Sequence, residues 1–296
     1  MDIDVSIIIV NYNTCGMTSN CIKSIYEKTE GVLFEIILVD NASIDGSKET
    51  FENDSRLLYI YLNENIGFGR ANNEGLKRAR GRNIFFLNSD TILINNAIKI
   101  LSEYLDQEAY VGAVGGNLYS CNGESLHSYR RLSPLLFEVD VLFAGILSKL
   151  LYRKNKEHNH TKKSLIVNTI VGADLMVKRM VLDQVGAFDN RFFMYCEETD
   201  LCHRIRNRGY NIVSIPNARI IHLEGASFSK NRMFERIKMN RKSLYLYCSI
   251  HYSKIYVGLV EIVWKITIYS RILVYSLIGS PKKDFWKKIK KTIYDT

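Results

Sequence analysis

Apolar residues gather in short runs along the first 119 positions of the chain, and each run ends in polar residues. The runs are VSIIIVNYN (5–13), FEIILVDNAS (34–43), LLYIYLN (57–63), NIFFLNSD (83–90) and VGAVGGNLY (111–119). Continuous apolar runs of this length are typical of strands that a parallel sheet buries on both faces. The segments between them predict helices over residues 17–29, 45–53, 69–81 and 95–107. Strands that alternate with helices predict an α/β fold with a mostly parallel, Rossmann-like sheet flanked by helices.

After residue 120 the alternation becomes less regular. Residues 128–164 are first apolar and then strongly basic, which predicts a flap or long insertion that is ordered only in part. Residues 165–189 predict a strand, a turn at Gly172 and a short helix. Residues 211–230 predict two short strands around Pro216. This part of the chain therefore predicts fewer regular βαβ units than the first part.

Polar residues stand at the ends of four successive predicted strands. They are Asn11, Tyr12, Asn13, Asp40, Asn41, Asn63, Asn88, Ser89 and Asp90. In parallel α/β sheets the ligand lies outside the carboxyl ends of the strands, so we expect a ligand site here. The Asp90 carboxylate would suit Mg²⁺ or Mn²⁺, which takes one or two protein carboxylates together with substrate phosphates. The alternative is that Asp90 only forms a turn.

Several common site patterns are missing from the sequence. GFGRAN (67–72) lacks the third glycine of a dinucleotide-binding loop, because Asn72 occupies that position, and it follows the third strand rather than the first. There is no GxxxxGK[ST] loop, no Gly-x-Ser-x-Gly elbow and no Cys/His spacing typical of zinc. The six cysteines show no paired spacing and are expected to be reduced thiols.

Positive charge is concentrated at the C-terminal end. The formal net charge is +9, and between Lys230 and Thr296 there are 15 Lys and Arg residues against 4 Asp and Glu. The main fold is thus close to neutral, which argues against a nucleic-acid surface. A basic tail suits anionic lipid, where each basic residue near the surface contributes about 1 kcal/mol.

Residues 232–296 have helical character, but their uncharged runs are far shorter than the ~18–20 residues of a spanning helix. Lys254, Glu261 and Lys265 fall near one helical face. The apolar residues that lie largely elsewhere are Tyr256, Val257, Val260, Trp264 and Ile268. This pattern predicts an interfacial amphipathic helix. The alternative is a helix that packs on the protein's own core. With no signal-peptide pattern, we expect a cytoplasmic protein, peripheral on the inner face of the membrane.

The stretch FMYCEETDLCHRIRNRGY (193–210) places three carboxylates at the start of a predicted helix. Acidic residues are favourable at a helix N-terminus because the helix dipole is positive there. One of these carboxylates is alternatively a base that takes a proton from a substrate. Asp200 lies four residues before Arg204, so an ion pair within the helix is its expected role.

Seven segments of the chain occur in the order seen in a known family. They are VSIIIVNYN, VDNASIDGS, NENIGFGRANNEG, FFLNSD, VGADLMVKR, FMYCEETDLCHRIRNRGY and HLEGAS. In this order the chain resembles the family-2 inverting glycosyltransferases of the GT-A fold, and most of all the bacterial rhamnosyltransferase-like branch. The resemblance covers residues 4–230.

The resemblance implies a GT-A domain over residues 1–230. Residues 1–119 would form its nucleotide-sugar-binding half, and residues 120–230, with the flap at 128–164, its acceptor-binding half. Residues 231–296 would form a basic tail of amphipathic helices.

The resemblance also implies roles for residues at the donor site. The expected donor-binding residues are Asn11, Asn13, Asp40, Asn41, Gly67, Phe68, Asn72 and Asn88. Among them, Asp40 resembles the residue that reads the nucleobase. Asp90 resembles the last acid of the family's Asp-x-Asp metal element, here Asn88-Ser89-Asp90, and His222 resembles a histidine that meets the metal or diphosphate in some relatives. The implied cofactor is Mg²⁺ or Mn²⁺.

On the acceptor side, Glu198 occupies the position of the family's catalytic base. The family's residue there is Asp, so Glu197 remains the alternative base, with Glu198 favoured. Arg130 and Arg131 in the flap are expected either to meet a diphosphate or to belong to a solvated loop. Asp200 belongs to the same acidic stretch.

The sequence therefore predicts an inverting glycosyltransferase that uses a nucleotide-diphosphate sugar, rhamnose being one candidate. The expected acceptor is a surface polysaccharide or a lipid-linked oligosaccharide, the expected second partner is a membrane surface, and no nucleic acid is expected. The alternatives are a non-catalytic, membrane-docked sugar-nucleotide binder and a nucleotidyltransferase. NYNTCGMTSN lacks the Gly-rich basic loop that nucleotidyltransferases carry after the first strand.

Overall fold

The computed structural model describes residues 3–152, 157–223 and 233–294. The chain forms two compact units. Unit 1 consists of Met1–Arg131, Glu157–Phe193 and Glu197–Ser227, and unit 2 consists of Leu132–Lys156, Met194–Cys196 and Phe228–Thr296.

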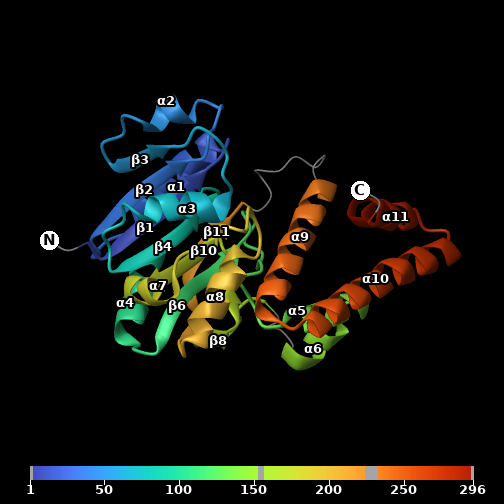
Figure 1. Cartoon of the computed structure of the whole chain (residues 1–296). Helices are drawn as coiled ribbons and strands as arrows, with labels where there is room; N and C mark the ends of the chain where they lie inside the picture. The colour runs from blue at the N-terminus through green and yellow to red at the C-terminus, as the bar shows by residue number, and fades with distance from the viewer. Residues whose placement is uncertain (1–2, 153–156, 224–232, 295–296) are drawn as a thin grey trace. The chain divides into compact units, whose positions relative to one another are not determined.

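A nine-stranded sheet forms the centre of unit 1 (Figure 1). Its strands are β1 (Val5–Asn11), β2 (Phe34–Asp40), β3 (Leu57–Tyr61), β4 (Asn83–Asn88), β5 (Thr91–Leu93), β6 (Val111–Tyr119), β8 (Leu165–Val167), β10 (Asp174–Lys178) and β11 (Asn211–His222). The order is β3-β2-β1-β4-β10-β6-β11-β5, with β8 also paired to β11. Strands β3, β2, β1 and β4 are parallel, as is the pair β6 and β11, whereas β10 runs antiparallel to both of its neighbours.

Helices cover both faces of this sheet. They are α1 (Cys15–Lys28), α2 (Ser47–Phe51), α3 (Phe68–Leu76), α4 (Ala97–Gln107), α7 (Arg179–Val185) and α8 (Glu197–Asn207). Alternate strand residues point to opposite faces, so Ile7 and Phe85 pack in one core with α1 and α4, while Ile8 and Phe86 pack in the other with α3 and α8. The prediction of a strand buried on both faces is confirmed for β1, whose residues are all buried, whereas the edge strand β3 is partly exposed.

Strand β11 differs from its prediction. Residues 211–222 form one strand rather than two, and its pairing with β6 shifts register between Ser214 and Arg219. Pro216 lies inside this irregular stretch, because a proline cannot donate to the ladder and is tolerated at a bulge. The single strand expected before the turn at Gly172 forms two short strands, β8 and β9 (Thr169–Ile170). The strands β10, which follows that turn, β5 and β7 (Tyr129–Arg130), which pairs with β9, were not predicted.

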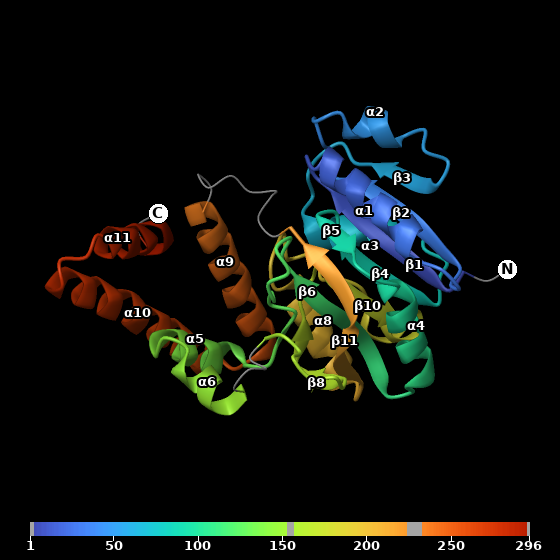
Figure 2. The same cartoon turned by 180° about the vertical axis from the view of Figure 1, so that it is seen from behind.

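Unit 2 is helical (Figure 2). Its helices are α5 (Pro134–Leu142), α6 (Ile146–Tyr152), α9 (Met233–His251), α10 (Lys254–Leu277) and α11 (Lys282–Tyr294). Helices α5 and α6 come from the predicted flap, which is therefore helical over most of its middle. Within the described residues, no helix combines the length and apolar composition that crossing a bilayer requires.

Helix α5 is attached to α10 at both of its ends. The backbone N–H of Leu135 donates to the Tyr256 hydroxyl at 2.9 Å. Arg271 Nη2 donates to the carbonyl oxygens of Val141 and Leu142, at 3.1 and 3.2 Å. Because the last carbonyls of a helix lack partners within the helix, this arginine satisfies groups that would otherwise need water.

Candidate active site

The end of β4 and the end of β11 bring three predicted residues together. Strand β5 pairs antiparallel with β11, which sets His222 opposite Thr91. The Nε2 atom of His222 then lies 3.2 Å from Asp90 Oδ1 and 3.4 Å from Asn88 Nδ2. His222 is more than 130 positions from Asn88 and Asp90 in the sequence, so only the sheet topology brings it next to them.

This pair offers a divalent cation one carboxylate and one imidazole nitrogen. The carboxylate of this set suits Mg²⁺ or Mn²⁺, and such an ion is usually bound through one or two protein carboxylates together with water and substrate phosphates. Among the described residues, no group of three or more His, Cys, Asp or Glu side chains is arranged to hold a metal ion. Asp90 and His222 therefore fit a metal held jointly with a substrate. Residues 224–227 of the HLEGAS segment lie outside the described residues.

Asn11, at the end of β1, forms hydrogen bonds with the neighbouring loops. Its Oδ1 accepts from the Thr14 hydroxyl at 2.6 Å and the Thr18 hydroxyl at 3.0 Å, and its Nδ2 donates to Ser43 Oγ at 3.1 Å. The Thr14 hydroxyl lies 3.0 Å from Ser89 Oγ. Asn11 thus links the end of β1 to the β2 loop and, through Thr14, to the segment that carries Asp90. Its contact with the nucleotide stays a prediction.

Asp40 is fully buried, and protein groups occupy both of its carboxylate oxygens. Oδ1 accepts from the Ser43 N–H at 2.8 Å and Oδ2 from the Tyr59 hydroxyl at 2.7 Å. Burial, and then the hydrogen bond to Asp40, raise the pKa of Tyr59. Nearby, Asn13 has a φ of 55° and accepts from the Ile44 N–H at 2.8 Å. Asp40 and Asn13 therefore shape this loop, and the contact of Asp40 with the nucleobase stays a prediction.

Two asparagines position the start of α3. Asn41 Oδ1 accepts from the Ile66 N–H at 3.0 Å, and its Nδ2 donates to Asn65 Oδ1 at 2.9 Å. Asn65 Oδ1 also accepts from the Gly67 N–H at 3.0 Å. The end of β2 is thereby joined to the loop that the sequence assigned to the donor.

Gly67 and its neighbours contact the acidic stretch directly. The Phe68 N–H donates to the Phe193 carbonyl at 2.9 Å. A Cβ added at Gly67, whose φ is +91°, would come within 2.3 Å of that same oxygen. One residue further on, a Cβ at Gly69 would lie 3.5 Å from the Glu197 Cβ. The predicted donor loop and the predicted base segment are therefore in contact.

Asn72 holds the first turn of α3 and leaves one polar atom without a protein partner. Its Nδ2 donates to the Phe68 carbonyl at 3.0 Å. Its Oδ1 is buried and has no hydrogen-bond partner among the described residues. Buried polar atoms normally have partners, so this oxygen is suited to a water or a ligand donor.

Glu197 begins α8 and is buried next to a second carboxylate. Burial, and then the charge of Glu198, raise the pKa of Glu197 well above its ordinary value, and the positive charge of Arg130 opposes the shift. Its Oε2 has no hydrogen-bond partner among the described residues. Glu197 therefore favours its protonated form in this position.

Glu198 lies close to the strand end that carries Asp90. A Cβ at Gly172 would lie 3.6 Å from the Glu198 Cβ and 4.0 Å from the edge of the Phe68 ring. The residue after Gly172, Ala173, accepts at its carbonyl from the Asn88 N–H at 3.0 Å. Two short steps thus connect Glu198 to the Asn88-Ser89-Asp90 segment.

The backbone just before these acids is unusual. Tyr195 and Cys196 have φ values of 71° and 65°, in the left-handed region that residues other than glycine seldom adopt. Each such residue stores about 1–3 kcal/mol, and this kind of strain concentrates at functional sites. The turn they form reorients the chain immediately before Glu197.

Asp200 forms the ion pair that its spacing predicts, so this expectation is confirmed. Its Oδ2 lies 2.8 Å from both Nε and Nη2 of Arg204. Arg204 also donates to the carbonyls of Gly186 and Ala187, at 3.0 and 2.7 Å. Asp200 therefore orients an arginine that holds the loop between α7 and α8.

Arg130 and Arg131 lie at and just after β7. The pairing of β7 with β9 places Arg130 opposite Thr169. Arg130 is exposed and acts on Glu197 through its charge. The Arg131 guanidinium carbon lies 5.7 Å from the centre of the Tyr129 ring. A diphosphate contact by either arginine stays a prediction.

Sequence reasoning missed several residues that build this site. Asn65 fixes Gly67, and its asparagine-x-glycine spacing is a turn signal that was available in the sequence. Thr14 links Asn11 to Ser89, but a threonine after a strand carries no distinctive pattern. Gly172 matters because it has no side chain beside Glu198, which only three-dimensional contact reveals.

The fold and this site define an α/β enzyme with a GT-A architecture whose polar groups gather at the carboxyl ends of parallel strands. The sequence model described as glycosyl transferase family 2 matches residues 6–186. The chain therefore belongs to glycosyl transferase family 2, a family of sugar-transferring enzymes.

Two relatives are similar to this chain in sequence, and one solved structure is similar to it in fold. The low-salt glycan biosynthesis hexosyltransferase Agl10 of Haloferax volcanii is 26% identical over 260 residues, covering 85% of this chain and 77% of the relative. The rhamnosyltransferase WbbL of Escherichia coli is 28% identical over 197 residues, covering 64% and 72%. The mannosyltransferase PcManGT from Pyrobaculum calidifontis, solved in complex with GDP-Man and Mn²⁺, matches with a TM-score of 0.61 at 15% identity, covering 99% of this chain and 85% of that one. The structural likeness establishes the fold.

Proposed function

We propose that this chain transfers a sugar from a nucleotide-diphosphate donor to an acceptor hydroxyl with inversion at the anomeric carbon. The acceptor would be a surface polysaccharide or a lipid-linked oligosaccharide, met at the inner face of the membrane. Rhamnose is one candidate sugar, because a rhamnosyltransferase is among the similar proteins. The observation that carries the proposal is the contact path from Asn88 through Ala173 and Gly172 to Glu198. It supports one cleft with a metal-binding side and a base side.

On the metal side, Asp90 and His222 would hold the cation, with Asn88 beside the imidazole. When bound, a divalent cation neutralises the charge that builds on the departing diphosphate. The structural relative solved with GDP-Man and Mn²⁺ supports this choice of cofactor. The buried Oδ1 of Asn72 and the loop at Gly67 would bind other parts of the donor.

On the base side, Glu198 is the better candidate. A general base must be unprotonated before it accepts the acceptor's hydroxyl proton, and a positioned base typically contributes 10²–10⁴-fold to the rate. Burial and the neighbouring carboxylate favour the protonated form of Glu197. Glu197 would thus support the position of Glu198 rather than replace it.

The test compares Glu198→Gln with Glu197→Gln. Nucleotide-sugars that stabilise the protein in a thermal-shift screen serve as donors, and release of nucleoside diphosphate is measured with Mn²⁺ and Mg²⁺. We expect E198Q to lower kcat by about 10²-fold or more, and E197Q to lower it less. Glu103→Gln, on the exposed face of α4, is the matched control and should behave as wild type.

Three results would count against the proposal. Wild-type turnover by E198Q would remove Glu198 as the base. A normal response of Asp90→Asn to metal concentration would remove Asp90 from the metal site. A protein that binds nucleotide-sugars but never turns them over would be a binder rather than an enzyme. For an active protein, the anomeric configuration of the product, determined by NMR, decides whether the reaction inverts.

A further inference from the structure

Helix α5 of unit 2 buries its charged side chains and exposes large apolar side chains. On α5, Glu138 and Asp140 are each only 2% exposed, whereas Phe137 is 37% exposed and Leu136 is 46% exposed. In a helix that faces water the arrangement is the reverse, with charges outward and apolar residues inward. The outer side of α5 is therefore built for surroundings less polar than water.

Three charged side chains of this unit, Arg241, Glu138 and Glu261, form a network of ion pairs. Arg241 on α9 forms an ion pair with Glu138 and a second with Glu261 on α10, at 3.2 Å. The Arg241 guanidinium also lies 4.7 Å from the centre of the Trp264 ring. The Tyr294 hydroxyl of α11 donates to Glu261 at 2.6 Å. These side chains join α5, α9, α10 and α11 and are here called the polar junction of unit 2. Apolar side chains of α5 and α10 are exposed instead.

Helix α10 has an apolar row that the sequence analysis did not single out. Val260 and Ile268, from the apolar set expected to face lipid, are buried. The outward row, here called the apolar stripe, recurs at spacings of three, four or seven residues. It consists of Ile255, Leu259, Ile262, Ile266, Leu273 and Leu277, each between 45% and 78% exposed.

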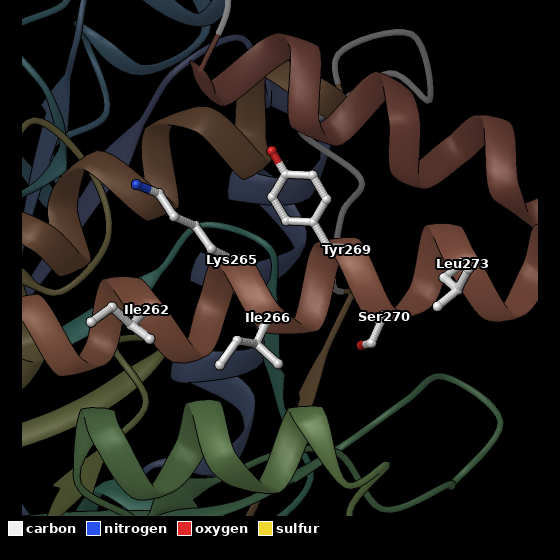
Figure 3. Close-up of a pocket in the computed structure, with 6 residues that line it drawn as sticks. All are labelled: Ile262, Lys265, Ile266, Tyr269, Ser270 and Leu273. Carbon is white, nitrogen blue, oxygen red and sulfur yellow. The ribbon is translucent and has the colours of Figure 1, made fainter.

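The middle of this stripe borders a shallow groove of about 380 Å³. Figure 3 shows the groove's lining side chains along successive turns of α10, among them Ile262, Ile266 and Leu273. The turn between α5 and α6, with the start and middle of α6, adds a second exposed apolar group, here called the hairpin tip. It consists of Phe143, Ile146 and Leu150, of which Leu150 is 74% exposed.

We infer that unit 2 docks on an anionic phospholipid bilayer through the apolar stripe and the hairpin tip. The inference deepens the membrane location proposed above and names helices from the predicted flap, rather than the basic tail alone, as lipid contacts. Apolar patches of this kind on one unit mark an interaction surface. An interfacial helix buries such a face among lipid headgroups and acyl chains while its basic residues meet anionic lipid.

Charge decides between a lipid surface and a second copy of the chain. Between Lys230 and Thr296 there are 15 Lys and Arg residues against 4 Asp and Glu. Lys287 and Lys291 on α11 are exposed. Bringing two such basic units together is opposed by like-charge repulsion, whereas an anionic bilayer attracts each of them.

The test measures co-sedimentation of the full-length protein with vesicles of phosphatidylcholine alone or mixed with phosphatidylglycerol. We expect wild type to bind the mixed vesicles. Leu273→Ser/Leu277→Ser in the stripe and Phe143→Ser/Leu150→Ser in the hairpin tip should each lower the partition coefficient about tenfold or more, because each removes two apolar side chains from the lipid contact. Tyr110→Ser, which changes a residue of unit 1 that is 78% exposed, should bind as wild type.

A further variant distinguishes loss of lipid binding from misfolding, which could also reduce binding by the serine variants. Lys287→Gln/Lys291→Gln changes only exposed side chains and should weaken binding to the mixed vesicles. Its donor turnover without vesicles should equal that of wild type, so loss of docking is distinguished from failure of the proposed catalysis. Wild-type partitioning by both serine variants would overturn the inference. So would a dimer in light scattering that the stripe variant dissociates, or a wild type that sediments with neither vesicle.

Discussion

Unit 1 contains buried carboxyl groups, and Asp174 is one of them. Asp174 is fully buried at the start of β10, and one oxygen accepts from the Gly116 N–H at 2.6 Å. Its other oxygen has no hydrogen-bond partner among the described residues. Burial raises the pKa of Asp174 well above its ordinary value, and the hydrogen bond from Gly116 opposes this only in part. The native state therefore favours the protonated acid.

This shift predicts how Asp174→Asn changes the pH dependence of stability. Because the folded pKa is the higher one, the neutral acid's contribution is complete below the unfolded pKa and is lost as pH rises through the folded pKa. Asparagine cannot ionise, so the free energy of unfolding of D174N should rise relative to wild type as the pH increases from about 4, the ordinary carboxyl pKa, through the raised pKa of the folded state. Urea unfolding at several pH values measures the difference. Exposed Asp183→Asn is the control, and a D174N difference that is constant with pH would contradict the assignment.

For the candidate site residues, the sequence predicted the position in a strand better than the contacts with distant residues. Asn88 and Asp90 follow a buried strand, so their place at the sheet edge could be read from the sequence. Their closeness to His222 depends on the pairing of β5 with β11, and β5 is too short to leave a pattern. Asp40 was correctly placed at the end of β2, but its hydrogen bonds with Ser43 and Tyr59 depend on tertiary contacts that local sequence does not encode.

At the scale of elements, the start of α3 is fixed against the segment before α8. Gly67 has a φ of +91° and lies against the Phe193 carbonyl, which accepts from the Phe68 N–H. A side chain at this position is disfavoured both by its backbone conformation and by the lack of space. The glycine therefore determines how closely the two segments approach.

Gly67→Ala should destabilise the protein by about 2 kcal/mol or more, because the left-handed conformation and the clash with Phe193 both disfavour alanine. Gly16→Ala is a matched control. Gly16 lies in α1, and a Cβ there would meet nothing within 4 Å, so this change should be neutral or stabilise by up to about 1 kcal/mol. Thermal unfolding compares the two. Equal melting temperatures for G67A and wild type would refute the argument.

Elements with a clear hydrophobic pattern were predicted well. Elements whose structure depends on contacts with distant parts of the chain were not. The last strand of the first half was expected at residues 111–119, and β6 spans the same residues. The single strand β11 was missed because Pro216 usually interrupts a strand, whereas here a change of register accommodates it. The outward face of α10 was missed because the helix is apolar on more than one side, so its pattern alone does not select the packed side.

At the scale of the whole molecule, sequence pattern and contacts divide the chain differently. The expected boundary fell near residue 230, whereas the contact-based division also assigns Leu132–Lys156 to the unit of the C-terminal helices. Helix α5 joins that unit through Tyr256 and Arg271, more than 100 positions away in sequence. Contacts over such separations cannot be read from local periodicity.

The polar junction of unit 2 leads to a prediction for Arg241→Ala. Removing this arginine leaves Glu138 buried and unpaired, which typically costs about 3–5 kcal/mol. Both tryptophans of the chain, Trp264 and Trp286, lie in this unit, so their fluorescence during urea unfolding reports on it. Arg236→Ala, at an exposed position of α9, should change the midpoint little. An unchanged midpoint for R241A would mean that the junction does not stabilise unit 2.

The left-handed pair Tyr195 and Cys196 restricts which mutations evolution can accept just ahead of Glu197 and Glu198. Glycine relieves the backbone strain there, and asparagine tolerates it better than most residues do, whereas valine or isoleucine increases it. Substitutions at these two positions are therefore tolerated best when they introduce glycine or asparagine. Directed evolution of the enzyme therefore has little freedom at the two positions just before Glu197.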